Sequence, residues 1–205
     1  DYLSSLDLSN NLIASIDWKY NTFPHLQQLL LQNNMLQSLS FLSAIPSLRA
    51  INLSGNKLSD AHVDVLCQMK LPHLTSLSLA SNALKKAPYV ARFQSLESLD
   101  LSHNFISTVD KGAFECGGSL KIINLAYNSL RKLDNVGSTS LLSLDVSHNR
   151  IPSVEEVGKL RVCQKILKFW FNDNPLSQRI APRIRCLCLL QSLQEMDGKP
   201  VSESD

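Results

Sequence analysis

Acidic, histidine and aromatic residues recur with similar spacing in the C-terminal half of the chain. The residues with potential chemistry are Asp100, His103, Asn124, Tyr127, Asp145, His148, Lys168 and Trp170. Aspartate together with histidine suggests a metal site or acid–base chemistry, whereas exposed tyrosine and tryptophan are typical anchors of protein interfaces. Which of these chemistries applies depends on how far apart the chain holds the side chains.

A repeated template carries these residues. The stretch LESLDLSHNFI, residues 96–106, has the form L-x-x-L-x-L-x-x-N-x-I. The same template begins at positions 3, 26, 48, 74, 96, 120, 141 and 166. Its asparagines are Asn11, Asn34, Asn56, Asn82, Asn104, Asn128, Asn149 and Asn174. So many filled copies strongly indicate a leucine-rich repeat solenoid, in which each repeat forms one coil.

The physical chemistry of the template predicts the fold. In L-x-L the leucines alternate with an outward residue, so each coil contributes a short strand with one buried face. The strands stack as a parallel sheet, because one coil alone cannot bury its apolar edge. The asparagine amide donates and accepts, so it can satisfy backbone groups in its own and the adjacent coil. The predicted class is α/β: a curved right-handed solenoid with the parallel sheet on the concave face and short helices or 3₁₀ turns on the convex face.

The segments that return from one strand to the next differ in length. Residues 59–71 carry apolar side chains three apart and begin with a serine and an aspartate that can cap a helix, which predicts a short helix. Residues 153–163 begin with Ser153 and place Glu156 three residues later, a capping-box pattern that predicts another helix. The shorter coils leave room for 3₁₀ or extended turns only.

The pattern changes after Asn174. A basic segment follows, with apolar residues at helical spacing: Ile180, Ile184, Leu187 and Leu190. The motif L-x-x-M-D-G-x-x-V comes next, and an incomplete repeat covered by a helix would seal the last coil from water. We therefore assign residues 1–176 to eight repeats and residues 177–205 to a C-terminal helical cap. Because Leu3 begins a repeat without any cover before it, we expect earlier repeats or an N-terminal cap upstream.

The repeats and this C-terminal segment resemble the SDS22-like leucine-rich repeat family with its C-terminal cap. In that family the cap runs N-P-L, a helix with basic residues, then L-x-x-L-D-G-x-x-V. Here Met196 replaces the second leucine, and no tyrosine follows N-P-L in the helix. The resemblance spans the chain and implies a mostly intracellular, non-enzymatic protein whose relatives bind different partners. It implies a cytoplasmic location, with the cytoskeleton, the cilium and the nucleus as further options.

The variable positions of the template face the concave surface, so the eight candidate residues should form one concave patch. Side chains two coils apart lie about 10 Å apart at a strand spacing of ~5 Å, too far to share a metal ion. The chain has no G-x-S-x-G, no phosphate-binding glycine loop and no H-E-x-x-H. We therefore expect no metal, cofactor, small-molecule substrate or catalysis. The predicted function is a rigid scaffold or regulatory module that binds another protein through this patch.

Two alternatives stay open. Region 159–185 could bind RNA, acidic tubulin tails or acidic lipid, although the net charge of +2 gives no general attraction to such partners. Its cations are Lys159, Arg161, Lys165, Arg179, Arg183 and Arg185. A secreted receptor-type ectodomain would need disulfides. The cysteine count of five is odd and no C-x-x-C occurs, which favours a reducing compartment and buried packing for Cys186 and Cys188.

Overall fold

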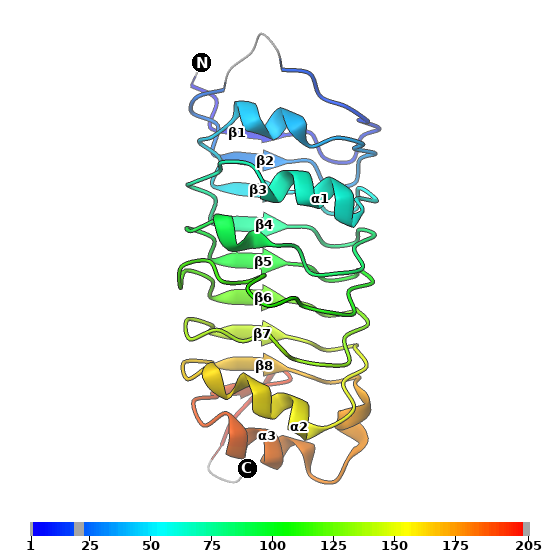
Figure 1. Cartoon of the computed structure of the whole chain (residues 1–205), viewed down its shortest axis with the longest axis vertical. Coiled ribbons are helices and arrows are strands. Elements are labelled where there is room, and N and C mark those ends of the chain that lie inside the picture. The colour runs from blue at the N-terminus through cyan, green and yellow to red at the C-terminus, as the bar shows by residue number, and fades with distance from the viewer. Residues whose placement is uncertain (1, 19–22, 203–205) are drawn as a thin grey trace.

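The computed structural model describes residues 2–18 and 23–202, so the predicted domain limits at residues 1 and 205 lie outside this part of the chain. Its strands form one sheet in chain order (Figure 1). They are β1 Ser5–Asp7, β2 Gln28–Leu30, β3 Ala50–Asn52, β4 Ser76–Ser78, β5 Ser98–Asp100, β6 Ile122–Asn124, β7 Ser143–Asp145, β8 Lys168–Trp170, β9 Glu195–Met196 and β10 Lys199–Pro200. Neighbours pair in parallel from β1 to β9, and β10 returns antiparallel to β9. This arrangement confirms the predicted solenoid.

The parallel strands pair residue for residue from coil to coil. From β2 to β8 the middle residue of a strand, such as Leu99 in β5, is buried and lies opposite the middle residue of each neighbouring strand. The residues on either side of it point to the opposite face, which we call the concave face. The third residues of the strands therefore form one column along this face, which we call the central column: Asp7, Leu30, Asn52, Ser78, Asp100, Asn124, Asp145 and Trp170.

The asparagines form a ladder along the solenoid, as the template predicted. Asn104 illustrates the pattern: its Nδ2 donates to the carbonyl oxygen of Leu79 in the preceding coil at 3.0 Å and to that of Leu101 in its own coil at 3.1 Å. Its Oδ1 accepts the N–H of Leu84 at 3.1 Å. Asn11 is the exception, because it is exposed and its Nδ2 donates to the carbonyl oxygens of Leu8 and Ser9 in its own coil. Each interior amide thus connects two coils through backbone groups that are otherwise buried.

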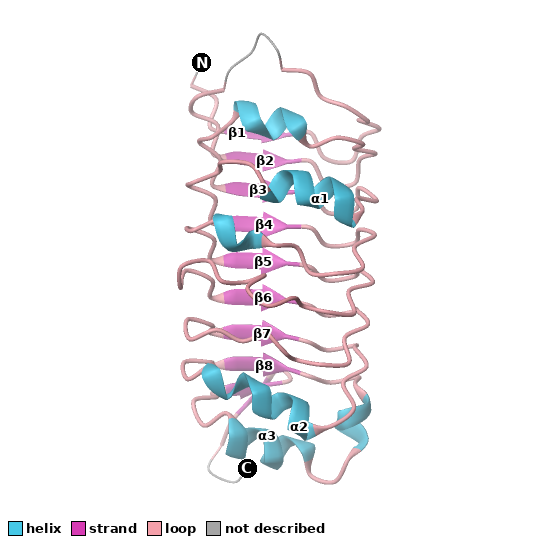
Figure 2. Ribbon diagram, in the orientation of Figure 1, coloured by secondary structure: helices cyan, strands magenta, loops and turns pink. Residues whose placement is uncertain are grey.

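The return segments cover the other side of the sheet (Figure 2). The predicted helix at 59–71 is confirmed as α1 Asp60–Cys67, and Ser59 and His62 form its capping box. The shorter coils carry 3₁₀ turns, η1 Ser40–Ala44 and η2 Val90–Arg92. One continuous core of leucine, isoleucine, valine and phenylalanine side chains fills the space between sheet and returns.

The second return helix differs in detail from its prediction. It is α2 Val154–Val157, continued by the 3₁₀ turn η3 Gly158–Val162, and Ser153 makes no side-chain bond to its backbone N–H groups. The capping box was wrong, because the Glu156 carboxylate is used elsewhere. It accepts the N–H of Leu133 in the preceding coil at 2.9 Å and pairs with Lys159. A contact between coils has replaced the local cap.

The C-terminal segment folds over the last coil. The 3₁₀ turn η4 Pro175–Gln178 and helix α3 Pro182–Leu189 precede β9, which adds the next strand to the sheet. The expected apolar helix face is wrong in part: Ile180 lies before the helix and is 89% exposed, and Ile184 is 51% exposed. Cys186 is buried as predicted, but Cys188 is exposed. Leu190 is buried as predicted and Leu187 packs against the core, so the segment uses part of the predicted face together with Cys186.

Candidate protein-binding site on the concave face

Three ring side chains stack on one another beside the sheet. Tyr127 lies between two imidazoles, with its ring centroid 4.2 Å from that of His103 and 3.9 Å from that of His148. The rings are within 12° of parallel. They belong to the loops that follow β5, β6 and β7, so the strand spacing of ~4.8 Å sets the distance between the rings. We call these three residues the aromatic stack.

The backbone fixes the direction of these side chains. This template position has a left-handed conformation in all eight coils, with φ between 51° and 66°. The residues there are Asn10, Asn33, Gly55, Ser81, His103, Tyr127, His148 and Asp173. Glycine, asparagine, aspartate and histidine tolerate this conformation, whereas a bulky tyrosine costs about 1 kcal/mol. Stacking on two neighbours, at about 0.5–1.5 kcal/mol a pair, offsets that cost for Tyr127.

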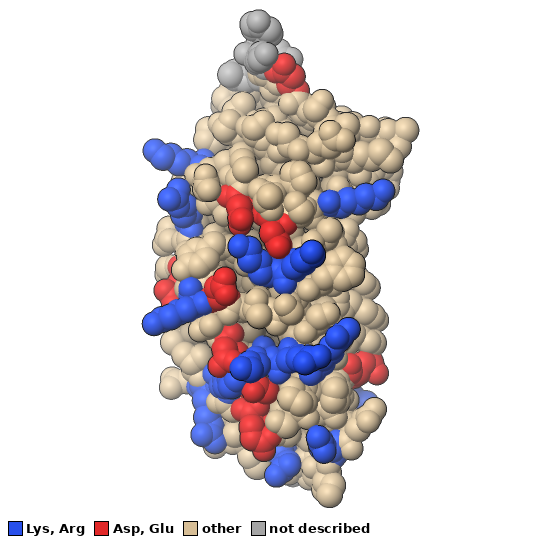
Figure 3. Space-filling model, turned by 45° about the vertical axis from the view of Figure 1, so that its right-hand side comes forward, with Lys and Arg blue, Asp and Glu red and all other residues tan. Residues whose placement is uncertain are grey.

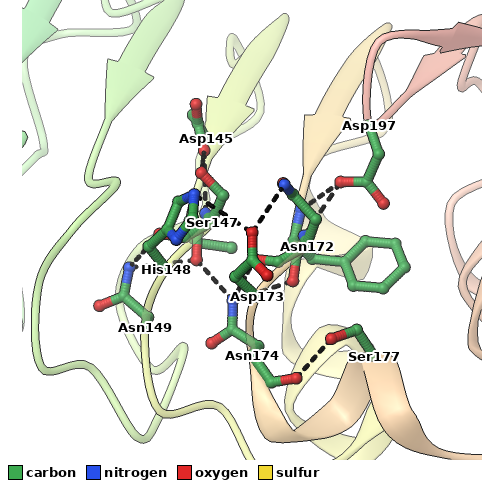
Figure 4. A network of polar contacts seen from close by, with 11 residues as sticks. Asp145, Ser147, His148, Asn149, Asn172, Asp173, Asn174, Ser177 and Asp197 are labelled. Carbon is green, nitrogen blue, oxygen red and sulfur yellow. Dashed lines mark hydrogen bonds and ion pairs between the residues drawn. The ribbon is translucent and has the colours of Figure 1, made fainter.

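Asp173 closes the C-terminal end of the aromatic stack. Its Oδ2 lies 3.2 Å from Nε2 of His148 and 3.2 Å from Nδ2 of Asn172. Figure 4 shows the carboxylate between these two side chains. This contact between Nε2 and the carboxylate orients the imidazole ring at the end of the aromatic stack. Asp173 occupies the same template position as His148, but the sequence analysis did not select it, because its pairing depends on how the side chains turn.

The stack shows ring edges and polar atoms to solvent. Rings that stack along the solenoid axis turn their faces to one another and their edges outward. Tyr127 is 45% exposed, and within the described part of the chain its hydroxyl has no hydrogen-bond partner. Ring edges carry the positive end of the aromatic quadrupole, and tyrosine and histidine add hydrogen-bonding groups. The surface therefore offers a rigid apolar body with polar tips.

The polar residues of the central column shape the loops. Oδ1 of Asp100 accepts the N–H of Ser102 at 3.0 Å, and Oδ1 of Asn124 accepts that of Ala126 at 3.0 Å. Asp145 accepts both the N–H and the hydroxyl of its i+2 neighbour, at 2.8 Å and 2.7 Å (Figure 4). Such Asx turns hold the loop that carries the stacked ring three residues after each of these side chains. These three predicted residues therefore have a positioning role in the structure.

The last two predicted residues lie at the C-terminal end of the concave patch. Lys168 pairs with Glu195 of β9, with Nζ and Oε2 2.8 Å apart. Trp170 ends the central column and is half-buried, opposite Asp145 in the register. The structure thus brings all eight residues onto one face, with the aromatic stack in the loops and the tryptophan on the last full strand.

The concave face holds no clustered metal ligands within the described residues. Asp100 and Asp145 are engaged with their loops, and Tyr127 separates the two imidazoles. The Ser147 hydroxyl donates to the Asp145 carboxylate at 2.7 Å and in this way supports its own loop. The groups that this face presents to solvent are ring edges, a hydroxyl and imidazoles.

The basic residues of region 159–185 are only partly brought together. Lys159 is paired with Asp134 and Glu156, at 2.8 Å each. The Arg183 guanidinium donates to the carbonyl oxygens of Met196 and Pro200 at 3.1 Å and 3.0 Å, so it holds the C-terminal segment in place. On the face seen in Figure 3, Lys and Arg side chains are spread along the molecule and alternate with acidic ones. This distribution weakens the case for an extended anionic partner.

All five cysteines are free thiols in the structure, and none of the described helices has the length and apolar character needed to cross a membrane. Burial raises the pKa of Cys67 and Cys186 to about 12 and that of Cys116 and Cys163 to about 11. These thiols behave as small apolar groups of the core.

The chain is a repeat solenoid, because its coils stack, each coil contributes one strand, and the strands form an exposed concave sheet. The leucine-rich repeat family model matches residues 1–58 and 94–151, and a second leucine-rich repeat model matches residues 70–86. The chain belongs to the leucine-rich repeat family. Members of this family are generally protein-interaction modules without enzymatic activity.

The chain is similar to cilia- and flagella-associated protein 410. It is 33% identical to the human protein over 90 residues, which cover 42% of this chain and 35% of that protein. The match to the mouse protein has 32% identity over 91 residues and covers 42% and 36%, respectively. The matched region thus spans about a third of the length of these relatives.

Solved structures share the fold. A leucine-rich repeat protein of Leptospira interrogans superposes with a TM-score of 0.76 at 23% identity, over 94% of this chain and 48% of that chain. Internalin C2 of Listeria monocytogenes gives a TM-score of 0.73 at 21% identity, over 94% and 79%. At such low identity these structures show the solenoid and nothing about partners.

Proposed function

We propose that this protein is a non-enzymatic binding module that captures a partner protein on its concave patch, with the aromatic stack as the anchor. The observation that carries the proposal is Tyr127 held between His103 and His148 at centroid distances of 4.2 Å and 3.9 Å. A tyrosine kept in a left-handed conformation and half-exposed is a rigid, amphipathic contact of the kind enriched at interface hot spots. Because the coils already fix its position, binding orders little of the chain.

The resemblance to the SDS22-like subfamily and the similarity to cilia- and flagella-associated protein 410 support a more specific role. We infer that residues 177–205 act as the C-terminal cap of the repeats. We also infer an intracellular protein that assembles on the cytoskeleton or in the cilium. Residues that close the sheet support the cap: Oδ1 of Asp197 accepts the N–H groups of Phe171 and Asn172 at 2.8 Å and 3.0 Å (Figure 4).

The experiment compares partner capture by the wild type and by Tyr127→Asn, quantified by mass spectrometry. Asparagine occupies the equivalent position in two other coils, so it tolerates the backbone and removes only the stack. We expect the free energy of unfolding to change by less than about 1 kcal/mol. Capture should weaken by about 30-fold, the effect of losing a hot spot worth about 2 kcal/mol. Trp170→Ala should weaken capture as well.

The matched control is Tyr89→Asn, which removes another half-exposed tyrosine from a return segment. It should leave capture unchanged. Equal capture by wild type, Tyr127→Asn and Trp170→Ala would refute the concave site. For the alternative basic partners, Lys165→Glu with Arg179→Glu should then abolish binding to single-stranded RNA, tubulin or phosphatidylserine vesicles. The secreted-ectodomain alternative fails if the natural protein titrates five free thiols.

A further inference from the structure

A groove lies on the convex side at the C-terminal end, between α2 with its extension η3 and helix α3. Figure 1 shows these helices next to each other. The groove has a volume of about 620 Å³ and is mostly apolar, within the range of about 300–1,000 Å³ that binding pockets occupy. Val154, Ile184 and Leu189 line it, together with Gly158. We call this feature the convex groove.

The exposure of the convex groove is unusual for a helix pair that already packs together. Ile184 points into it and is 51% exposed. A Cβ added to Gly158 would meet no atom within 4 Å, so the space above this residue is open. An apolar side chain left in solvent beside open space indicates a surface that another molecule can cover.

The charges at the groove indicate what kind of partner it can bind. Lys159 is neutralised by Asp134 and Glu156. Arg161 and Arg185 line the same groove, and within the described residues neither guanidinium has a hydrogen bond or an ion pair. The groove also holds Glu155, whose pKa is lowered first by a hydrogen bond from Ser153 and further by nearby arginines. Glu155 therefore offsets part of the charge of Arg185, and the guanidinium of Arg161 has no acidic partner within salt-bridge distance among the described residues. An apolar floor with these two arginines complements an apolar segment that carries carboxylates.

The walls determine the form of that segment. Both walls are helical, so their backbone N–H and C=O groups are already paired and offer no edge for an added strand. Side chains alone can make the contacts, which is the helix-in-groove mode of recognition. An eight-residue wall such as α3 is about 12 Å long and matches two to three turns of a helix.

We propose that the convex groove binds an amphipathic helix of a partner protein that carries acidic residues beside its apolar face. Leucine-type side chains at i, i+3, i+4 and i+7 fill the floor, and the flanking carboxylates pair with Arg161 and Arg185. This surface is independent of the concave patch, since the core of the solenoid separates them.

Cys188 supplies a local reporter, because it lines the groove and is the one exposed cysteine of the chain. The probe is a synthetic peptide of about three turns with leucines on one face and glutamates beside them. We expect the peptide to slow the reaction of Cys188 with a thiol reagent in a saturable manner, and to do so less at high salt. A scrambled peptide of equal composition and a peptide with lysine in place of glutamate should give no protection.

Three variants test the groove. Gly158→Leu should abolish protection, because its backbone is already helical and the new side chain fills the open space. Arg161→Glu with Arg185→Glu should weaken the peptide affinity at least tenfold, or about 1.4 kcal/mol. Lys165→Glu is the matched control, since it changes an exposed cation of the same region outside the groove lining and should have no effect.

Several results would overturn the proposal. These are no protection by the acidic peptide, equal protection by the scrambled peptide, and unchanged protection in Gly158→Leu. Protection by phosphatidylserine vesicles instead of the peptide would identify a membrane surface. Protection that rises with protein concentration in the absence of peptide would identify a second copy of the chain. Failure of this test leaves the concave-patch experiment unaffected, because that experiment follows Tyr127 and this one follows Cys188.

Discussion

Replacing Asn104 with alanine tests the asparagine ladder. The side chain is 6% exposed, and its Nδ2 also lies 3.1 Å from the carbonyl oxygen of Ser102. The three carbonyl acceptors keep other donors: Leu79 keeps the amide of Asn82, Leu101 keeps the amide of Asn128, and Ser102 keeps the N–H of Ser81. Among the described residues, the N–H of Leu84 donates only to Oδ1 of Asn104, so the variant leaves this buried donor unpaired.

These contacts give the expected magnitude. An unpaired buried N–H costs about 1–3 kcal/mol. The two amide hydrogens of Asn104 contribute about 0.5–1.5 kcal/mol each in lost bonds. The variant should therefore lose about 4 kcal/mol of unfolding free energy, a large share of the about 5–15 kcal/mol typical of a domain. Urea unfolding followed by circular dichroism measures this loss.

Asn11→Ala is the matched control, with the same residue type at the same template position. Asn11 is exposed and bonds the carbonyl oxygens of Leu8 and Ser9 in its own coil. Water can replace those bonds, so we expect a loss below about 1 kcal/mol. Asn104→Asp should be as destabilising as alanine at pH 7, because a carboxylate oxygen then faces carbonyl oxygens. Equal losses for Asn104→Ala and Asn11→Ala, or a neutral Asn104→Asp, would refute the two-coil role of the amide.

Further tests address other contacts and the burial of the cysteines. Glu156→Ala should lower the free energy of unfolding by about 1–2 kcal/mol, because it leaves both the N–H of Leu133 and Lys159 without this partner. Asp134→Ala removes only an ion pair, so it should cost below about 0.5 kcal/mol in the same urea assay. Native protein should expose one rapidly reacting thiol to Ellman's reagent, and a second fast thiol would contradict the burial of the others. In the folded protein the pKa values of the four buried thiols are raised to about 11–12. Their contribution to the free energy of unfolding is therefore fully present below about pH 8.5, the pKa of a cysteine in an unfolded chain, and it declines as the pH rises toward 12. Replacing all four by alanine should therefore reduce the loss of unfolding free energy between about pH 8.5 and pH 12, as measured by urea unfolding at each pH. They are Cys67, Cys116, Cys163 and Cys186.

The template predicted the parts of the structure that follow from the spacing of its residues and from the hydrogen-bonding groups of their side chains. The leucines had to face inward, the register followed from the constant spacing, and a donor–acceptor amide was required where Asn104 lies. The same reasoning placed His103, Tyr127 and His148 in one column. Their stacking depends on side-chain rotation and on the left-handed backbone that brings each ring over the next. A sequence pattern specifies neither the side-chain torsion angles nor the backbone conformation.

The errors arose where tertiary contacts override a local signal. Ser153 and Glu156 fit a capping box, yet Glu156 gains more by satisfying the backbone of Leu133 in the preceding coil. Ile184 and Cys188 fit a buried helix face, yet α3 packs through Cys186 and leaves them beside the convex groove. Local rules consider one coil, whereas the stability of a solenoid lies in the contacts between coils.

The same coupling between coils relates the two proposed surfaces. The coil that begins with β7 carries His148 on the concave side and continues into α2 on the convex side. Asn149, between them, is tied to Leu125 of the preceding coil, and its Oδ1 accepts the N–H of Leu130. These bonds hold the two surfaces at a fixed separation. A partner that contacts both would gain from the second site without ordering the protein further, so its affinity should exceed that of either site alone. Closure of the convex groove should then leave the affinity of a partner that uses only the concave patch unchanged, whereas either change alone should weaken the binding of a partner that uses both surfaces.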